Sequence, residues 1–246
     1  MRETLVDYLR GARQRTLDAY PSASNFANKY YSGCTYALWK VAHPVTGAVS
    51  GLVLDAGSGR GGWKDIILKA GAVRETVDIE PREDLTWTAD LEAMPQVPDA
   101  RYDAVVCHQV LEHVPDPGSA LSEIFRVLKP GGLLILSVPH LSRLHELPHD
   151  YFRYTPNGMR AVLERSGFEV SQIAPYGGLL TFVHHQAATV VLGLAAIWRP
   201  LFLAAVAFNA PFSVLSSGLD RLIDRSALMP NGIVVTSSKP PPRNGE

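Results

Sequence analysis

One stretch constrains the fold more than any other, residues 52–63, which read LVLDAGSGRGGW. Three apolar residues lead to an acid, Asp55, and glycines follow at positions 57, 59, 61 and 62. This order predicts a buried strand, a tight turn and the start of a helix. Glycine suits the turn because it tolerates positive φ and lets a ligand approach bare backbone. The free N–H groups at the helix start then favour a polar or anionic ligand.

The glycine spacing allows two interpretations. Gly57, Gly59 and Gly62 fit G-x-G-x-x-G, the dinucleotide-binding fingerprint. Asp78 follows about twenty residues later, where that fold holds a ribose hydroxyl, so a nicotinamide-dependent oxidoreductase is one alternative. However, Asp55 stands two residues before Gly57, and the resulting D-x-G-x-G resembles motif I of class I S-adenosylmethionine (SAM) methyltransferases.

Composition narrows the classes of function. The chain has 246 residues, enough for one large domain or for one domain with an elaboration, and 46% of them are hydrophobic. Its net charge is −1 and it has no block of Lys and Arg, so we expect no nucleic-acid partner. The two cysteines, Cys34 and Cys107, lack a metal-binding spacing and fit a reducing cytosol.

Residues 1–50 precede the first strand and are predicted to form an N-terminal helical cap. Leu5, Tyr8 and Leu9 mark one helical face, beside a short basic cluster of Arg10, Arg13 and Arg15. The cluster fits a solvated face or contact with an anionic lipid or substrate. There is no apolar h-region, so these residues are not a secretory signal. The aromatic-rich segment that follows either caps a ligand cleft or packs on the sheet edge.

From residue 51 onward, strand and helix patterns alternate, which predicts a parallel sheet with helices on both faces. The expected strands are 52–55, 73–79, 87–88, 103–107, 133–138, 168–173 and 232–237. The expected helices are 63–70, one through Leu121–Leu128 that stops at Pro130 and Gly131, and one that begins after Thr155 and ends at Gly167.

The motifs in this order resemble the UbiE/small-molecule (methyltransferase type 11) branch of class I SAM methyltransferases over residues 51–175 and 231–239. The matching pieces are VLDAGSGRGG, TVDIEP, ADLEAMP, RYDAVVCHQVLEHVPDP, EIFRVLKPGGLLILSVP and RYTPNGMRAVLERSGFEV. The resemblance implies an α/β, Rossmann-like fold with a seven-stranded, mostly parallel sheet whose last strand is antiparallel. We therefore expect a cap (1–50), a SAM-binding core (51–176), a hydrophobic helical insertion (177–230), a final core strand (231–239) and a disordered tail (240–246).

The resemblance also implies that the cofactor is SAM. Asp55, Gly57 and Gly59 would then cradle its amino-acid end, and Asp78 would hold its ribose hydroxyls. The other implied contacts are Asp90 and Leu91 against adenine, and His108 and Gln109 beside the sulfonium and the substrate. Asp90 also fits a turn or cap acid, and His113 is expected to be structural rather than a base.

The loop after the fifth strand, PHLSRLHELPHDYFRYT, carries the catalytic candidates. His149 beside Asp150 can take a proton from an attacking hydroxyl while the carboxylate orients the imidazole. The alternative is a hydrogen-bonded cluster that only holds the loop in place. We expect no metal, because Pro148 interrupts the H-x-x-x-H spacing of His145 and His149, and H-E-x-x-H is absent.

An apolar insertion separates the sixth and last strands. Residues 177–218 contain a single Lys, Arg, Asp or Glu residue, Arg199, and Arg199-Pro200 splits the segment into the apolar arms 187–198 and 201–208. Arms of ~18 and ~12 Å are too short for a bilayer core of ~30 Å, so we expect no crossing. Three alternatives stay open: a lid over a hydrophobic substrate pocket, peripheral membrane contact through 177–218, and a buried helical pair or homo-oligomer interface.

Together these features predict a SAM-dependent methyltransferase that acts on a small hydrophobic or lipid-linked acceptor. Oxygen is the favoured acceptor atom, and carbon and nitrogen stay open. The expected location is the cytoplasm or the periphery of the inner membrane face. The alternatives are an NAD(P)-dependent oxidoreductase with the same Gly-rich turn, and a non-catalytic, SAM-binding, membrane-associated scaffold.

Overall fold

The computed structural model describes residues 11, 22–224 and 228–242. The predicted N-terminal helical face, its basic cluster and residues 243–246 of the predicted tail lie outside the described residues. The chain divides into two compact units. The sheet unit comprises Val41–Gly59, Trp63–Pro175 and Gly232–Glu246, and the helical unit comprises Met1–Lys40, Arg60–Gly62 and Tyr176–Asn231. The N-terminal segment and the insertion, which the sequence analysis treated separately, thus share one unit.

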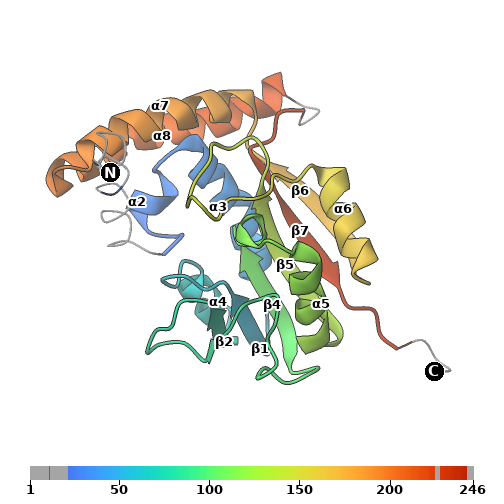
Figure 1. Cartoon of the computed structure of the whole chain (residues 1–246). Coiled ribbons are helices and arrows are strands. Elements are labelled where there is room, and N and C mark those ends of the chain that lie inside the picture. Colours follow the sequence, from blue (N-terminus) through green and yellow to red (C-terminus); the bar gives the residue numbers. More distant parts are fainter. Residues whose placement is uncertain (1–10, 12–21, 225–227, 243–246) are drawn as a thin grey trace. The chain divides into compact units, whose positions relative to one another are not determined.

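The sheet unit contains a seven-stranded sheet in the order β3-β2-β1-β4-β5-β7-β6 (Figure 1). Its strands are β1 (Leu52–Ala56), β2 (Val73–Asp78), β3 (Trp87–Thr88), β4 (Tyr102–His108), β5 (Leu128–Pro139), β6 (Glu169–Tyr176) and β7 (Gly232–Ser238). β1 pairs in parallel with β2 and β4, and β4 pairs in parallel with β5. β7 runs antiparallel to β5, which confirms the predicted fold class and its antiparallel last strand.

Both faces of the central strands β1 and β4 are buried, as expected for parallel strands between helices. On β1, Leu54 belongs to the core beneath α5 (Pro117–Val127) and α6 (Pro156–Arg165). Its neighbour Val53 points to the opposite core, which includes Ile67 of α4 (Lys64–Lys69). This alternation follows from the two-residue period of a strand.

Polar caps set the starts of the covering helices. Asp116 accepts hydrogen bonds from the N–H groups of Gly118 and Ser119 at the start of α5, and Thr155 accepts from Gly158 at the start of α6. The predicted end of α5 at Pro130 and Gly131 is wrong. The helix ends at Val127 because the chain joins the sheet at once, with Leu128 paired to Tyr102.

The helical unit contains α2 (Phe26–Lys29), the first part of α3 (Gly33–Thr46), α7 (Leu179–Ala195) and α8 (Arg199–Ile223). α7 and α8 lie side by side as a hairpin (Figure 1). Arg199 begins α8 at the hairpin turn, as predicted.

The predicted length of the hairpin arms is wrong. α7 has 17 residues and α8 has 25, which correspond to about 26 and 38 Å of helix. The sequence analysis ended each arm where polar residues begin, but these polar residues continue the helices as part of their buried face. Among the described helices, α8 is the one long and apolar enough to cross a membrane by length and composition. The length argument against a crossing therefore fails.

Candidate functional site

The Gly-rich turn follows β1 at the centre of the sheet, where the strand order reverses between β1 and β4. Ligands of open α/β sheets bind at this switch point, beyond the carboxyl ends of the strands. Gly57 has φ +67° and its N–H donates to the carbonyl of Val77 at 2.9 Å. A Cβ atom on Gly57 would lie 2.5 Å from a methyl of Val110, so this position admits no side chain. Gly59 also has positive φ, +49°, and has open space beside it.

Asp78 lies against this turn, at the end of β2. Its Oδ2 accepts a hydrogen bond from the N–H of Gly59 at 2.7 Å, and its Oδ1 accepts from Glu80 at 3.2 Å. Each carboxylate oxygen can accept a second bond, so Asp78 keeps the capacity to bind hydroxyl groups. Asp78, the residue predicted to bind the ribose hydroxyls, thus lies next to the glycines of motif I.

Asp55, at the end of β1, is buried and accepts a hydrogen bond from Nε of Arg74 at 2.8 Å. Burial raises the pKa of Asp55, and the guanidinium of Arg74 opposes that rise. This pair ties β1 to β2 directly below the turn. The predicted contact of Asp55 with the amino-acid end of a cofactor stays a prediction.

The next predicted pair, Asp90 and Leu91, follows β3. Oδ1 of Asp90 accepts from the N–H of Glu92 at 3.0 Å, so this carboxylate closes its own turn. Leu91 is buried in the main core of the sheet unit. The turn role that the sequence left open for Asp90 is therefore present, and its role toward adenine stays a prediction.

His108 and Gln109 stand at the carboxyl end of β4. The ring nitrogens of His108 lie 2.8 Å from the hydroxyl of Thr46 and 3.0 Å from that of Ser137. Burial lowers the pKa of His108 to about 3, so its ring is neutral at physiological pH. Trp63 packs on the same ring at a centroid distance of 4.1 Å. His108 is therefore held between Thr46, Ser137 and Trp63, and its predicted place beside the sulfonium stays a prediction.

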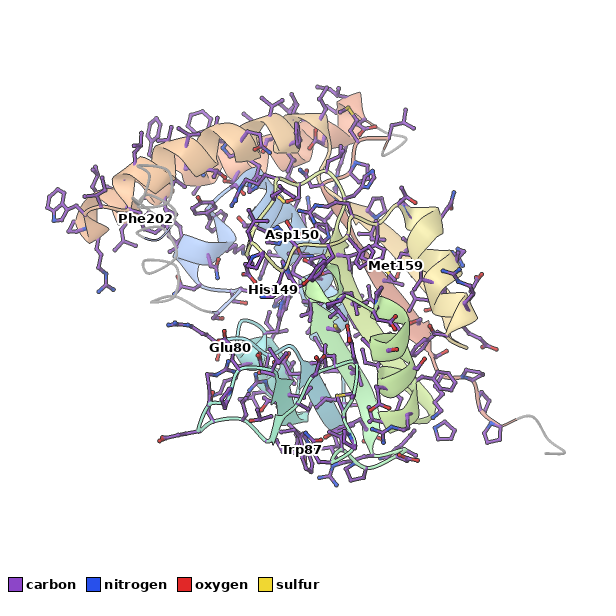
Figure 2. All side chains as sticks on the ribbon, in the orientation of Figure 1. Glu80, Trp87, His149, Asp150, Met159 and Phe202 are labelled. Atoms are coloured by element: carbon purple, nitrogen blue, oxygen red, sulfur yellow. The ribbon has the colours of Figure 1, made fainter. Side chains whose placement is uncertain are left out.

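The predicted pairing of His149 with Asp150 is wrong, although the two adjoin in the loop after β5 (Figure 2). The Asp150 carboxylate accepts bonds from both terminal nitrogens of Arg153, at 2.6 and 2.7 Å, and from the N–H of His145 at 2.8 Å. The ring of His149 instead lies 3.1 Å from the hydroxyl of Tyr151. His149 closes a turn with Glu146, and Asp150 follows that turn, so the two side chains meet different partners.

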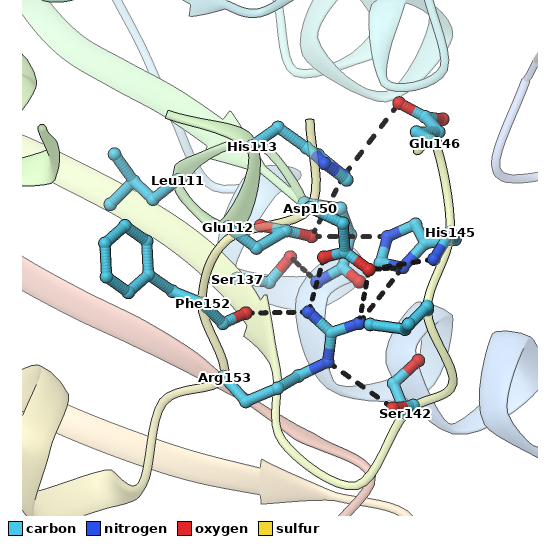
Figure 3. Close-up of polar contacts among 12 residues, drawn as sticks. Leu111, Glu112, His113, Ser137, Ser142, His145, Glu146, Asp150, Phe152 and Arg153 are labelled. Carbon is cyan, nitrogen blue, oxygen red and sulfur yellow. Dashed lines mark hydrogen bonds and ion pairs between the residues drawn. The ribbon is translucent and has the colours of Figure 1, made fainter. Parts of the chain in front are cut away.

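A different cluster joins this loop to the residues that follow β4. The short helix η1 (Leu111–His113) brings Glu112 and His113 next to His145 (Figure 3). Oε1 of Glu112 lies 3.8 Å from Nε2 of His113 and 3.9 Å from Nε2 of His145. Their donor atoms all lie within 4.8 Å of one another, as the ligands of a divalent cation would.

Glu112 is the most unusual member of this cluster. Its side chain is completely buried, and neither carboxylate oxygen has a hydrogen-bond partner among the described residues. Burial raises the pKa of Glu112 to about 8, so the group is mostly protonated at neutral pH. Its backbone carbonyl accepts from the N–H groups of Tyr151 and Phe152, which fastens the loop to η1.

A hydrogen bond to a carbonyl oxygen fixes the tautomer of His113. Nδ1 of His113 lies 2.6 Å from the carbonyl oxygen of His149 and must donate to it, because a carbonyl only accepts. In neutral His113, the lone pair of Nε2 then faces Glu112. Nδ1 of His145 lies 3.3 Å from the carbonyl oxygen of Arg143 and 3.5 Å from Nη2 of Arg153, so its contacts suit either tautomer. The lone pair of His113 therefore points toward the carboxyl group, and it can accept a proton or bind a cation.

A match to a known protein family decides the assignment. Residues 40–173 match the methyltransferase domain family. The chain belongs to this family. Its match covers the Gly-rich turn, Asp78, η1 and the loop after β5.

Two curated relatives agree with this assignment. An S-adenosylmethionine-dependent methyltransferase of Mycolicibacterium smegmatis is 34% identical over 137 residues, covering 48% of this chain and 52% of that protein. The ubiquinone biosynthesis O-methyltransferase of Methylococcus capsulatus is 33% identical over 100 residues, covering 34% of this chain and 41% of that protein. The chain thus matches about half or less of the length of these relatives.

Solved structures share the fold. A SAM-dependent methyltransferase from Archaeoglobus fulgidus aligns with a TM-score of 0.53 at 18% identity, covering 82% of this chain and 91% of that one. The 1,6-didemethyltoxoflavin-N1-methyltransferase of Burkholderia thailandensis, with bound S-adenosylhomocysteine, aligns with a TM-score of 0.52 at 17% identity, covering 92% and 88%. At these identities the likeness shows the fold alone.

The cofactor of this family is S-adenosylmethionine, and the methyltransferase turn fits it. Gly57 has no room for a side chain, Gly59 opens to free space, and Asp78 adjoins both with acceptor capacity left. When bound, SAM supplies an electrophilic methyl group. The family assignment sets aside the oxidoreductase alternative that the glycine spacing had left open.

The Glu112–His113–His145 cluster was not predicted from the sequence. His113 was expected to be structural, and His145 was considered only with its own loop. A signal was present, because Glu112 and His113 follow one strand and His145 follows its neighbour, and neighbouring parallel strands end at the same sheet edge. The pairing depends on how the loop folds back, which the spacing alone does not show.

Proposed function

We propose that this methyltransferase transfers the methyl group of SAM to a hydroxyl oxygen of a small hydrophobic or lipid-linked acceptor. The observation that carries the proposal is the Glu112–His113–His145 cluster beside the cofactor turn. Val110, which would contact a Cβ on Gly57, precedes Glu112 by two residues. A hydroxyl acceptor needs a base in this position, and the name of the Methylococcus capsulatus relative is that of an O-methyltransferase.

His113 is the residue best placed to act as the base. The carbonyl of His149 holds the proton on Nδ1, so Nε2 is free to accept another. During transfer, the acceptor oxygen forms a bond to the methyl carbon while the bond from that carbon to sulfur breaks. The hydroxyl proton passes to Nε2 of His113. The positive charge of the sulfonium is lost as the imidazolium forms.

Two carboxyl groups stabilise that imidazolium. Oε1 of Glu112 and Oε2 of Glu146 lie 3.8 and 3.9 Å from Nε2 of His113. Glu112 carries its charge only above a pKa of about 8, so its support strengthens as the pH rises.

A divalent cation bound by Glu112, His113 and His145 is the second candidate. Nδ1 of His113 is held by a carbonyl oxygen, the arrangement that orients a histidine toward a metal. A cation there would bind the acceptor oxygen and lower the pKa of its hydroxyl. The two candidates differ in one measurable way, since a chelator would abolish only the metal-assisted reaction.

The deciding experiment incubates the protein with methyl-labelled SAM and a cell extract that includes the membrane fraction. We expect the label on an ether or ester oxygen of an extractable, hydrophobic product. Label on nitrogen or carbon contradicts the hydroxyl acceptor. SAM binding with no labelled product from any extract supports the non-catalytic scaffold instead. Repeating the reaction after chelation distinguishes the proton route from the cation.

A further inference from the structure

The α7–α8 hairpin has its polar side chains inside the helical unit. In the C-terminal half of α8, the buried residues are Ser213, Ser216, Ser217 and Asp220. In α7, Thr181 and His185 are buried. A helix on the surface of a water-soluble protein shows the opposite pattern, with its polar residues outward.

Hydrogen bonds join this polar interior to Tyr30, Tyr31 and Gly33. Asn209 donates from Nδ2 to the carbonyl oxygens of Tyr30 and Tyr31, both at 3.0 Å. Nδ1 of His184 accepts from the N–H of Gly33 at 3.0 Å, so its Nε2 carries the proton and donates to Asn209 at 2.9 Å. A Cβ on Gly33 would lie 2.5 Å from Oγ of Ser216, so the backbone approaches the hairpin as closely as glycine allows.

Asp220 joins the two helices of the hairpin. Its carboxylate accepts from the N–H groups of Leu180 and Thr181, at 2.8 and 3.0 Å, and from the Thr181 hydroxyl. An acidic group at a helix N-terminus is favourable because it meets free N–H groups and the positive end of the helix dipole. The polar face of the hairpin is therefore buried and hydrogen-bonded inside the helical unit.

The outer face of the hairpin is apolar. Every exposed residue of α7 is Val, Ala or Leu. In α8, every exposed residue is apolar or glycine except Arg199 in the first turn and Arg221 in the last. The largest contributors to this outer face are Val190, Leu194, Trp198, Leu201, Phe208 and Leu215. Within α7, Val183, Val190 and Leu194 repeat at i, i+7 and i+11, so they share one stripe.

We propose that this outer face docks on an anionic phospholipid bilayer, with both helices lying in the membrane plane. A protein partner would need polar contacts, because protein interfaces carry roughly one hydrogen bond per 100–200 Å². Between Leu201 and Leu219 the exposed side chains offer no hydrogen-bonding group, and hydrocarbon requires none. The remaining exposed charges, Arg199 and Arg221, are both cationic, and Trp198 adjoins Arg199 at the turn. Arginine and tryptophan favour the lipid headgroup region.

The polar inner face explains why the hairpin lies in the plane rather than crossing. Its hydrogen bonds attach it to Tyr30, Tyr31 and Gly33, close in the chain to the charged Lys29. Insertion of both helices would carry these groups into hydrocarbon, where unsatisfied polar groups cost several kcal/mol each. Only the outer face can enter lipid at no such cost. The predicted cytoplasmic location stays a prediction, and the inference needs no property of methyl transfer.

The test is flotation of the full chain with vesicles of phosphatidylcholine mixed with phosphatidylglycerol. The hairpin variant Val190→Ser/Phe208→Ser should lower the vesicle partition coefficient by roughly 100-fold, because it removes buried apolar groups. The control Leu68→Ser/Val73→Ser should bind like the wild type. One site of each pair is matched in exposure, with Val190 at 64% and Val73 at 63%. Arg199→Gln/Arg221→Gln should remove the preference for phosphatidylglycerol over phosphatidylcholine alone.

Trp198 provides a second measurement on the unaltered protein. Lipids brominated on their acyl chains should quench its fluorescence, and Trp198→Phe should abolish most of that quenching. SAM binding by the variant Val190→Ser/Phe208→Ser shows that this variant is folded. If the variant does not fold, the quenching of Trp198 in the wild-type protein decides whether the outer face enters the bilayer. Wild-type protein that neither floats nor is quenched overturns the proposal. A dimer that Val190→Ser/Phe208→Ser dissociates, together with no vesicle binding, assigns this face to a second copy and also overturns it.

Discussion

The imidazole of His113 donates from Nδ1 to the backbone carbonyl of His149 at 2.6 Å. This bond separates the two histidines by role. Nε2 of His113 faces the carboxyl of Glu112, whereas His149 contributes its backbone to the cluster and turns its ring toward Tyr151. A substitution that keeps the carbonyl should therefore keep the cluster.

Replacing His113 should remove the base. We expect His113→Ala to lower kcat by about 10²–10⁴-fold, the usual contribution of general base catalysis, with SAM affinity near the wild-type value. His149→Ala is the matched control and should retain most of the activity, because its carbonyl remains. Turnover of labelled SAM and calorimetric SAM binding measure both effects. Equal losses of kcat in His113→Ala and His149→Ala would show that the ring of His113 is not the base that we propose.

Glu112 should make stability depend on pH. Its pKa is raised from 4.5 to about 8 in the folded protein, so the native state binds more protons than the unfolded chain between these values. The stability that the protonated group provides is complete below pH 4.5 and is lost as the pH rises through about 8. Within that window, the free energy of unfolding falls by up to about 1.4 kcal/mol for each pH unit of increase.

The matched variant is Glu112→Gln, which keeps the shape and removes the titration. Urea unfolding at several pH values should show a flatter profile for the variant, and a smaller stability difference between pH 6 and pH 9. Parallel profiles for variant and wild type would mean that Glu112 is charged in the folded protein near pH 6.

Asp150 should act in the opposite direction, as a buried carboxylate held by Arg153. Bonds from Arg153 hold the pKa of Asp150 well below 3.8, so its stabilisation is present above that pH and is lost as the pH falls below it. Arg153→Met leaves the buried charge without this partner and should cost about 3 kcal/mol. Asp150→Asn/Arg153→Met should recover part of that loss. If denaturant unfolding shows that Asp150→Asn adds a further loss of stability to that of Arg153→Met, the pairing of Asp150 with Arg153 is contradicted.

The central sheet was predictable because its signals are local. Runs such as 52–55 and 103–107 are apolar on both faces, and the Gly-rich turn marks the end of β1. The main error in strand boundaries concerned β5, which begins at Leu128 rather than Leu133. There the pairing with Tyr102 extends the strand through Pro130 and Gly131, residues that usually interrupt structure.

The candidate site was predicted only in part, because its key contacts are long-range. Asp78 reaches Gly59 as the strand order requires, and the sequence motif already implied their proximity. His145 meets Glu112 through the path of an irregular loop, which no periodicity encodes. The hairpin shows the same limit, since residues such as Asn209 and Ser213 suggest the end of a helix until their buried partners are known.

Asp78 should contribute to SAM affinity through its remaining acceptor capacity. We expect Asp78→Ala to weaken SAM binding by about 1.5–3 kcal/mol, the usual value of a hydrogen bond to a charged group. Asp84→Ala is the control, because Asp84 is an exposed acid on the same loop and pairs only with Arg82 among the described residues. Calorimetry measures both. Unchanged affinity in Asp78→Ala, with the fold intact, would place the ribose elsewhere.

The two glycines of the turn should tolerate alanine differently. Both have positive φ, so each substitution carries backbone strain of order 1 kcal/mol. At Gly57 the new Cβ would also lie 2.5 Å from a methyl of Val110, whereas at Gly59 no atom lies within 4 Å. Gly57→Ala should therefore displace Val110, and with it the start of η1, so that SAM binding and turnover both fall further than in Gly59→Ala. Adding Val110→Ala should restore part of the loss to Gly57→Ala and should not help Gly59→Ala. Calorimetry and labelled-SAM turnover across the four variants test this, and a rescue of both glycine variants alike would show that the contact with Val110 is not what limits the turn.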